Sequence, residues 1–481
     1  MSASFFFYDL ETSGFSARSA RIMQFAGQRT DLDLKPIGEP VNHLIKLSPD
    51  VLPDPGAILV TGITPQQTLI EGLTEAEFLK IFSDEVVQPD TIFIGFNSIR
   101  FDDEFMRFLL YRNFYDAYEW QWQNGCSRWD LLDVVRMTRA LRPDGIEWPF
   151  APDGKPANRL EFLTRVNKLS HDNAHDALSD VNATIALARL IKEKQPELFD
   201  YLLKHRDKKS VAELIGGGQP FVYTTGRYSS EYLHTSVAVL LARHDKQDAA
   251  LVYDLRFDPT PFVNMSVAEI KKAWAFTKDP DALRLPVKTV KYNRCPAAAP
   301  LGVIKDETTQ ERLQLSLETV QQNLKLLQKH HQELAAKVAQ AVSELDADRE
   351  RSQTSLVDNP LTVDERLYDG FIDGGDKTIM RAIRAAAPKS LTDFVDQLSD
   401  QRLKSMLPLY KARNFPSALN AEERESWEAF CRQKLFDGDA ASPAALYFQR
   451  LQELASSQLS DAQRYLLEEL QLYGESILPT E

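Results

Sequence analysis

Two acidic residues near the start of the chain could hold a divalent cation. Asp9 and Glu11 end an aromatic segment, and residues i and i+2 of a strand share a face, so their carboxylates would project together. Such a pair is costly unless a cation neutralises it. Acid-x-acid pairs also arise by chance in a chain with 70 acidic residues among 481, so the position at a strand end is what gives this pair weight.

Two further acidic segments follow along the chain. Residues 97–104 read Asn-Ser-Ile-Arg-Phe-Asp-Asp-Glu, so Asp102 and Asp103 begin a predicted helix and could be ordinary N-terminal helix charges. Residues 171–180 read His-Asp-Asn-Ala-His-Asp-Ala-Leu-Ser-Asp and open another predicted helix. There His175 and the acids around it could be a solvated pair.

Taken together, the three segments predict phosphodiester hydrolysis. Oxygen ligands without cysteine suit Mg²⁺ or Mn²⁺, and His175, five residues before Asp180, suits a general base. Two metals about 3.5 to 4 Å apart stabilise both the attacking water and the leaving 3′ oxygen of an in-line displacement. A catalytically silent nucleic-acid-binding scaffold is the alternative, although it would be expected to lack at least one of these carboxylates.

Composition limits the class of protein. With 481 residues, 43% of them hydrophobic, the chain should form two to four packed domains. The net charge of -14 means that local basic patches would have to bind a nucleic acid. Residues 201–300 are relatively basic with interspersed aromatics, which suits single-stranded nucleic acid but also an ordinary solvated surface. Three widely spaced cysteines fit a reducing cytosol, and no segment predicts secretion or a membrane span.

The elements that must position these residues follow from periodicity. Strands are predicted over residues 5–10, 22–29, 41–47 and 91–96. Helices are predicted over residues 75–87, 102–112, 129–141, 159–167 and 174–194. This order indicates an α/β domain over residues 1–195.

The rest of the chain is predicted to form two further domains. Short strands over residues 211–258 indicate a small β-barrel-like, SH3-like region, and a long amphipathic helix follows, with apolar positions from Leu313 to Leu345. Together they make a domain over residues 196–350, in which the helix packs internally or, as the alternative, forms a dimeric coiled coil. Residues 351–360 indicate a linker into an all-helical C-terminal domain over residues 351–481.

The motifs are similar to those of the DEDD exonuclease superfamily, which is ribonuclease H-like in fold. They read Asp-x-Glu at 9–11, Asn-x-x-x-Phe-Asp at 97–102 and His-x4-Asp at 175–180. His175 indicates the histidine subclass, because position 176 is Asp where the other subclass carries Tyr. The strings at residues 61–65, 100–104, 111–116, 127–133, 173–177 and 412–416 resemble the bacterial exonuclease I family. The resemblance is weakest over residues 216–254, where DNA contacts stay unassigned.

The resemblance implies a 3′ to 5′ exodeoxyribonuclease that hydrolyses single-stranded DNA to 5′-mononucleotides in DNA repair and recombination. It implies two Mg²⁺ per site, with Mn²⁺ as a substitute, held by Asp9, Glu11, Asp102 and Asp180, and His175 as the base. Asp103 competes with Asp102, but only Asp102 directly follows the motif phenylalanine. A different enzyme of the same superfamily, such as an exoribonuclease or a proofreading exonuclease, would share these acids.

The resemblance also implies binding residues and a protein partner. It places Arg107, Tyr118, Trp122, Arg136 and Arg159 on the DNA strand, although Trp122 could be a core aromatic. It implies binding of single-stranded-DNA-binding protein through the acidic tail of that protein, on a basic surface near Arg142. We further expect a cytoplasmic monomer, no membrane partner, and a nuclease that stays folded when the chain is truncated near residue 350.

Overall fold

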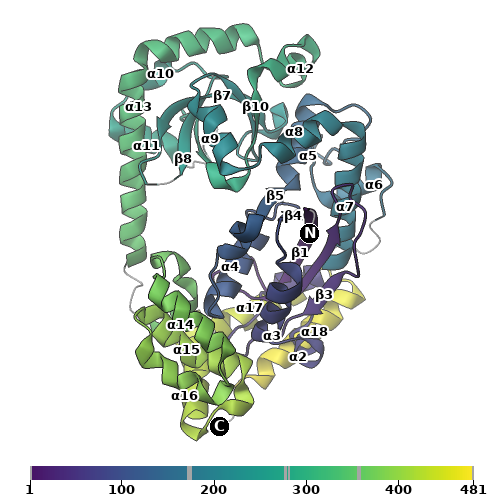
Figure 1. The fold of residues 1–481 in the computed structure, drawn as a ribbon, viewed down its shortest axis with the longest axis vertical. Helices are drawn as coiled ribbons and strands as arrows, with labels where there is room; N and C mark the ends of the chain where they lie inside the picture. The colour runs from purple at the N-terminus through teal and green to yellow at the C-terminus, as the bar shows by residue number, and fades with distance from the viewer. Residues whose placement is uncertain are drawn as a thin grey trace. The chain divides into compact units, whose positions relative to one another are not determined.

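The computed structural model describes residues 3–170, 176–246, 248–275, 279, 282–354 and 359–478. The predicted base His175 lies outside the described residues. The chain forms two compact units (Figure 1). Unit 1 comprises Met1–Ser127, His171–Ile185 and Asp358–Glu481, and unit 2 comprises Arg128–Ser170 and Ala186–Val357.

The predicted N-terminal strands belong to one mixed sheet, with the strand order β3-β2-β1-β4-β5. β1 pairs antiparallel with β2 and parallel with β4. The strands are β1 (Ser4–Thr12), β2 (Ile22–Thr30), β3 (Val41–Leu44), β4 (Thr91–Gly95) and β5 (Ser127–Asp130). The first four were predicted, although β3 is shorter than expected. The fifth was not, because the helix expected from residue 129 begins only at Leu131, where the Asp130 side chain caps it by accepting from Leu132 N.

Short helices and α4 complete the N-terminal part of unit 1. The helices are α1 (Pro55–Thr61), α2 (Pro65–Glu71), α3 (Glu75–Ile81), the π-helical turn Phe82–Val86, α4 (Asp102–Arg112) and the first half of α7 (Ala177–Lys194). The sequence analysis missed α1 and α2, which have seven residues each and are too short to show periodicity. Their signal was the N-cap followed by proline, Asp54-Pro55 and Thr64-Pro65.

The C-terminal part of unit 1 is helical, as predicted. Its helices are α14 (Gly374–Ala385), α15 (Gln401–Asn414), α16 (Ala421–Phe436), α17 (Pro443–Ala455) and α18 (Asp461–Ser476), with 3-10 segments Pro360–Glu365, Leu367–Asp369 and Pro388–Gln397. Phe108 and Tyr111 of α4 share a buried cluster with Met406 and Tyr410 of α15. A second shared cluster joins α1 and β2 to α17 and α18. The C-terminal helices therefore share their cores with the N-terminal part of the unit.

A buried ionic network also joins these two parts of unit 1. Arg413 Nη2 lies 2.7 Å from Asp50 Oδ2 and 2.8 Å from Asp364 Oδ2, and Arg21 Nη2 lies 2.6 Å from Asp364 Oδ2. Lys434 Nζ lies 2.6 Å from Asp50 Oδ2. Burial alone would raise the pKa of Asp50, but the surrounding cations outweigh it and hold that pKa well below its usual value. The buried charges of Arg21 and Asp50 are thus compensated only when the C-terminal part of unit 1 is present.

Unit 2 contains an antiparallel sheet with the strand order β10-β6-β7-β8-β9. The strands are β6 (Phe221–Thr224), β7 (Thr235–Arg243), β8 (Ala249–Asp254), β9 (Val287–Lys291) and β10 (Ala297–Pro300). Val211 and Ile215 of α9 pack on this sheet against Phe221 and Val252. The prediction of strand structure from residue 211 was wrong at its start, because Asp207 caps a helix there, α9 (Lys208–Gly216).

The remaining helices of unit 2 include one of 38 residues, α13 (Leu317–Thr354). The others are α5 (Leu131–Leu141), α6 (Leu160–Val166), α8 (Pro196–Lys204), α10 (Thr260–Val263), α11 (Val267–Trp274) and α12 (Glu307–Arg312). α13 packs against α10, α11 and β7. Its residues Val320, Leu327 and Leu334 are buried in this unit, which favours the internal packing role over a coiled coil. The linker predicted from residue 351 starts too early, because the helix continues to Thr354.

Among the helices that the structure describes, none combines the length and the apolar character that crossing a bilayer requires.

Candidate active site

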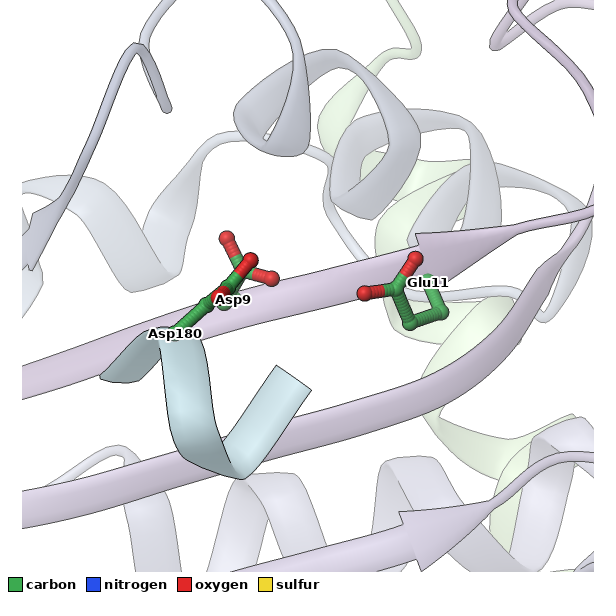
Figure 2. A group of neighbouring side chains, drawn as sticks. All are labelled: Asp9, Glu11 and Asp180. Carbon is green, nitrogen blue, oxygen red and sulfur yellow. The ribbon is translucent and has the colours of Figure 1, made fainter. Parts of the chain in front are cut away.

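Asp9, Glu11 and Asp180 come together in unit 1 (Figure 2). Each offers one carboxylate oxygen, and these three oxygens all lie within 4.8 Å of one another. Asp9 and Glu11 project from the same face of β1, and Asp180 comes from the first turn of α7. Residues 171 positions apart in the sequence thus meet as the motif spacing predicts.

The electrostatics of this cluster are unfavourable without a cation. Burial, followed by the charges of Asp9, Asp180 and Asp176, raises the pKa of Glu11 to about 9. Burial, followed by the charges of Asp102, Asp180 and Asp176, also raises the pKa of Asp9 well above its usual value. A divalent cation would relieve this repulsion, and an all-carboxylate donor set suits Mg²⁺ or Mn²⁺.

The two adjacent acids at the start of α4 have different surroundings. The Tyr8 hydroxyl donates to Asp103 Oδ1 at 2.5 Å, and Arg107 Nη2 lies 4.0 Å from Asp103 Oδ2. Both acids are buried, and it is the charge of Asp102 that acts on Asp9. The geometry therefore favours Asp102 over Asp103 as the fourth acid of the site.

Asp176 is a residue of the site that the sequence analysis did not single out. Its Oδ2 accepts from Ser179 N at 3.0 Å, which caps the start of α7. Its charge is among the causes that raise the pKa of both Asp9 and Glu11. The available signal was its position four residues before Asp180, on the same side of a helix start.

Three of the residues expected to contact DNA lie in unit 1. Arg107 Nη1 donates to Glu104 Oε1 at 2.6 Å, and its guanidinium carbon lies 5.6 Å from the centre of the Tyr118 ring. The Trp122 side chain is 62% exposed, so it is not the core aromatic of the alternative interpretation. The buried tryptophan of this segment is Trp120.

Tyr368, in the C-terminal part of unit 1, contacts the Glu104 side chain that also accepts from Arg107. Its hydroxyl donates to Glu104, and its ring lies 5.7 Å from that of Phe108. The guanidinium carbon of Arg18 lies 6.0 Å from the centres of the Phe108 and Tyr368 rings. No sequence signal identified Tyr368, because the contact joins residues 264 positions apart.

The other two residues expected to contact DNA lie in unit 2. Arg136 donates to Asp133 Oδ1 at 2.7 Å, and its side chain is only 14% exposed. Its guanidinium packs so closely on Gly226 that a Cβ at that position would lie about 3.0 Å from Arg136 Nη1. The Arg159 side chain is 74% exposed and lies near the Phe162 ring. Of these two guanidinium groups, that of Arg159 is the more accessible to a phosphate.

Models of three protein families match successive parts of the chain. An exonuclease family matches residues 6–188. The exonuclease I SH3-like domain matches residues 206–344. The exonuclease I C-terminal domain matches residues 361–477. These matches agree with the predicted α/β, SH3-like and helical parts of the fold.

Several known proteins are similar to this chain over nearly the whole length of both sequences. Exodeoxyribonuclease I of Escherichia coli (strain K12) is 38% identical over 484 residues, which cover 99% of this chain and 98% of that protein. The structure of a moderately thermophilic exonuclease I from Methylocaldum szegediense has a TM-score of 0.90 at 40% identity, and covers 99% of this chain and 100% of its own. The structure of E. coli exonuclease I in complex with a dA16 oligonucleotide has a TM-score of 0.90 at 36% identity, with the same coverage.

Two other similar structures show relatives in further complexes. One is an SSB/exonuclease I structure in complex with the inhibitor CFAM, with 36% identity and a TM-score of 0.88. The other is the zinc-ion-bound form of an E. coli exonuclease I complex with single-stranded DNA, with 35% identity and a TM-score of 0.90.

Proposed function

The chain belongs to the exonuclease I family, and from this premise we propose that it is an exodeoxyribonuclease that degrades single-stranded DNA from its 3′ end. The observation that carries the proposal is the convergence of Asp9, Glu11 and Asp180 within 4.8 Å, in a chain that matches this family from its nuclease part to its C-terminal part. The products are 5′-mononucleotides, and the activity serves DNA repair and recombination.

Residues of this site suit two Mg²⁺ ions, with Mn²⁺ as a substitute. The donor set consists of carboxylates, and the pKa values of Asp9 and Glu11 are raised first by burial and then by the negative charges around them, which favour a divalent cation. Asp9, Glu11, Asp102 and Asp180 would hold the ions. When bound, a metal pair activates a water molecule and stabilises the charge on the leaving 3′ oxygen. His175 would take the proton of the attacking water.

The strand is held by other residues in this proposal. Trp122 and Tyr118 offer ring faces on which bases can stack, and stacking tolerates any base sequence. Arg107, Arg136 and Arg159 would bind phosphates, Arg159 with the most exposed side chain. The acids and the strand-binding groups are different residues, so metal binding and strand binding can be measured separately.

We propose single-stranded-DNA-binding protein as a partner of this chain. A relative in the family has been solved as an SSB/exonuclease I structure. The expected contact is the acidic tail of the partner on a basic surface of unit 2 that includes the exposed Arg142. Such a contact should weaken with salt, because few charge pairs are screened readily. A monomer in the cytoplasm is the proposed state and location.

Digestion of end-labelled oligonucleotides tests the proposed activity. With Mg²⁺, single-stranded DNA carrying a 5′ label should shorten progressively, while the blunt duplex and the RNA of the same sequence should be degraded much more slowly. EDTA should stop the reaction. Rapid release of the label from the 5′ end, or faster digestion of RNA, would contradict the proposal.

A further inference from the structure

Gln24 lies on the sheet face that carries the acids. It pairs with Glu11 across β1 and β2, and directly paired residues of antiparallel strands share a face. Ala26, two residues on, pairs with Asp9 on one side and with Asn42 on the other. The Gln24 residue is only 6% exposed. A buried amide is costly unless its polar atoms have hydrogen-bond partners, so the partners of Gln24 indicate why it is there.

These partners connect three elements. Gln24 Nε2 donates to Asn42 Oδ1 at 3.0 Å and to Asp176 Oδ1 at 3.3 Å. Gln24 Oε1 accepts from Ala177 N at 3.4 Å. One side chain of β2 thus contacts β3 and the first residues of α7.

The start of α7 carries Asp180 into the site. Asp176 Oδ2 accepts from Ser179 N, and Asp180 N donates to the Asp176 carbonyl, both at 3.0 Å. Asp180 follows Asp176 by four residues, which is about one helical turn. A displacement of Asp176 from the sheet would therefore move Asp180 relative to Asp9 and Glu11.

We propose that Gln24 is a positioning residue, which holds the start of α7 on the sheet and so keeps Asp180 at metal-binding distance from Asp9 and Glu11. This inference rests on the proposed function, because it assumes that the three acids bind the catalytic metals. An amide suits the role, since it can hold the Asp176 carboxylate without adding a positive charge. A lysine or an arginine at position 24 would also bind Asp176, but it would weaken the negative field that attracts the cation.

Gln24→Leu tests the inference, and Gln28→Leu is its matched control. Gln28 lies on the same strand, is 5% exposed, and donates to the Arg29 and Ile37 carbonyls. Among the contacts that the structure describes, none of those made by the Gln28 side chain reaches α7. Both variants should lose some thermal stability in EDTA, because each leaves buried polar groups without a partner.

The discriminating measurement is the dissociation constant of Mn²⁺ from the full chain without DNA, determined by calorimetry. Gln24→Leu should raise the Mn²⁺ dissociation constant about 10- to 100-fold, as is typical when a group that orients a metal ligand is removed. Gln28→Leu should leave that constant unchanged. In activity assays, Gln24→Leu should need more Mn²⁺ for half-maximal rate and should regain turnover at saturating Mn²⁺, because Asp180 itself is intact.

Several results would overturn the inference. It is wrong if Gln24→Leu binds Mn²⁺ as the unaltered chain does, or if Gln28→Leu weakens binding equally. If Gln24→Leu does not fold, Asn42→Ala replaces it, since this variant removes one partner of Gln24 and should weaken Mn²⁺ binding to a smaller extent; unchanged binding would again count against the inference. If the unaltered chain binds no Mn²⁺ at the acids, the proposed function itself fails.

Discussion

The Tyr8 hydroxyl donates a hydrogen bond of 2.5 Å to the carboxylate of Asp103, across 95 positions of the sequence. This contact directs one of two adjacent acids into the core of unit 1, where Arg107 also lies near it. Asp102 is the acid whose charge acts on Asp9. The hydrogen bond from Tyr8 on β1 to Asp103 therefore supports the proposal that Asp102 is the acid of the metal site.

This relationship predicts different effects for the two acids. Asp102→Asn should lower the cleavage rate by a factor on the order of 10² or more, because it removes the charge of a proposed metal ligand. Asp103→Asn should retain most of the activity and lose stability instead, by about 1 to 3 kcal/mol, because the Tyr8 hydrogen bond is weakened. Single-turnover rates and urea unfolding of both variants check this. Equal loss of activity in the two variants would contradict the assignment.

The raised pKa of Glu11 predicts a stability effect that depends on pH. Its pKa is about 9 in the folded, metal-free chain and about 4.5 when unfolded. The unfolded state therefore loses its proton first as the pH rises, and the folded state loses stability between about pH 4.5 and 9. Glu11→Gln removes this penalty. In EDTA its melting temperature should exceed that of the unaltered chain, by a gap that widens from pH 5 to pH 9.

Divalent cations should reverse that order. Millimolar Mg²⁺ should raise the melting temperature of the unaltered chain more than that of Glu11→Gln, because the variant has lost a charged ligand. In EDTA, a difference in melting temperature between Glu11→Gln and the unaltered chain that does not change with pH would show that the pKa of Glu11 is not raised in the folded chain.

The buried ionic network predicts a large loss of stability for a single substitution. Asp364→Ala leaves the buried Arg413 and Arg21 without one of their carboxylate partners, so the free energy of unfolding should fall by about 3 to 5 kcal/mol. Asp369→Ala is the matched control, because Asp369 pairs with Arg366 and both of these side chains are partly exposed. Its effect should stay within about 1 kcal/mol. Urea unfolding of the two variants measures both values.

Truncation after about residue 350 should abolish stable folding of unit 1. The sequence alone suggested that the nuclease would survive this cut. The structure changes the expectation, because the cut would expose Phe108 and Tyr111 and would leave the buried Asp50 without Arg413 and Lys434. The truncated chain should be aggregated or rapidly proteolysed, whereas a soluble truncated chain with a cooperative melting transition would contradict the shared core.

The sequence predicted the elements that carry the acids but not the contacts that orient them. The strand bearing Asp9 and Glu11 and the helix bearing Asp180 have clear periodicity and motifs, so their convergence could be expected. The roles of Tyr8, Gln24 and Tyr368 could not, because each depends on a partner far away in the sequence. A buried glutamine in a strand has no local pattern that distinguishes it from an exposed one.

The network around Asp50 was hidden for the same reason. Its members come from residues 21 to 434, and each looks like an ordinary surface charge in the sequence. Only the packing of the C-terminal helices on the N-terminal part removes them from solvent. The clusters that the C-terminal helices share with the N-terminal part could therefore not be predicted from the order of the elements alone.

Anomalous scattering from crystals grown with Mn²⁺ and a short single-stranded DNA tests the central claim most directly. The account predicts two Mn²⁺ peaks about 3.5 to 4 Å apart, bounded by Asp9, Glu11, Asp102 and Asp180, with the phosphodiester nearest the 3′ end of the strand between them. The same crystals of Asp180→Ala should lose at least one peak while retaining density for the strand. Absence of Mn²⁺ at these four acids, in crystals whose protein cleaves DNA in solution, would contradict the account.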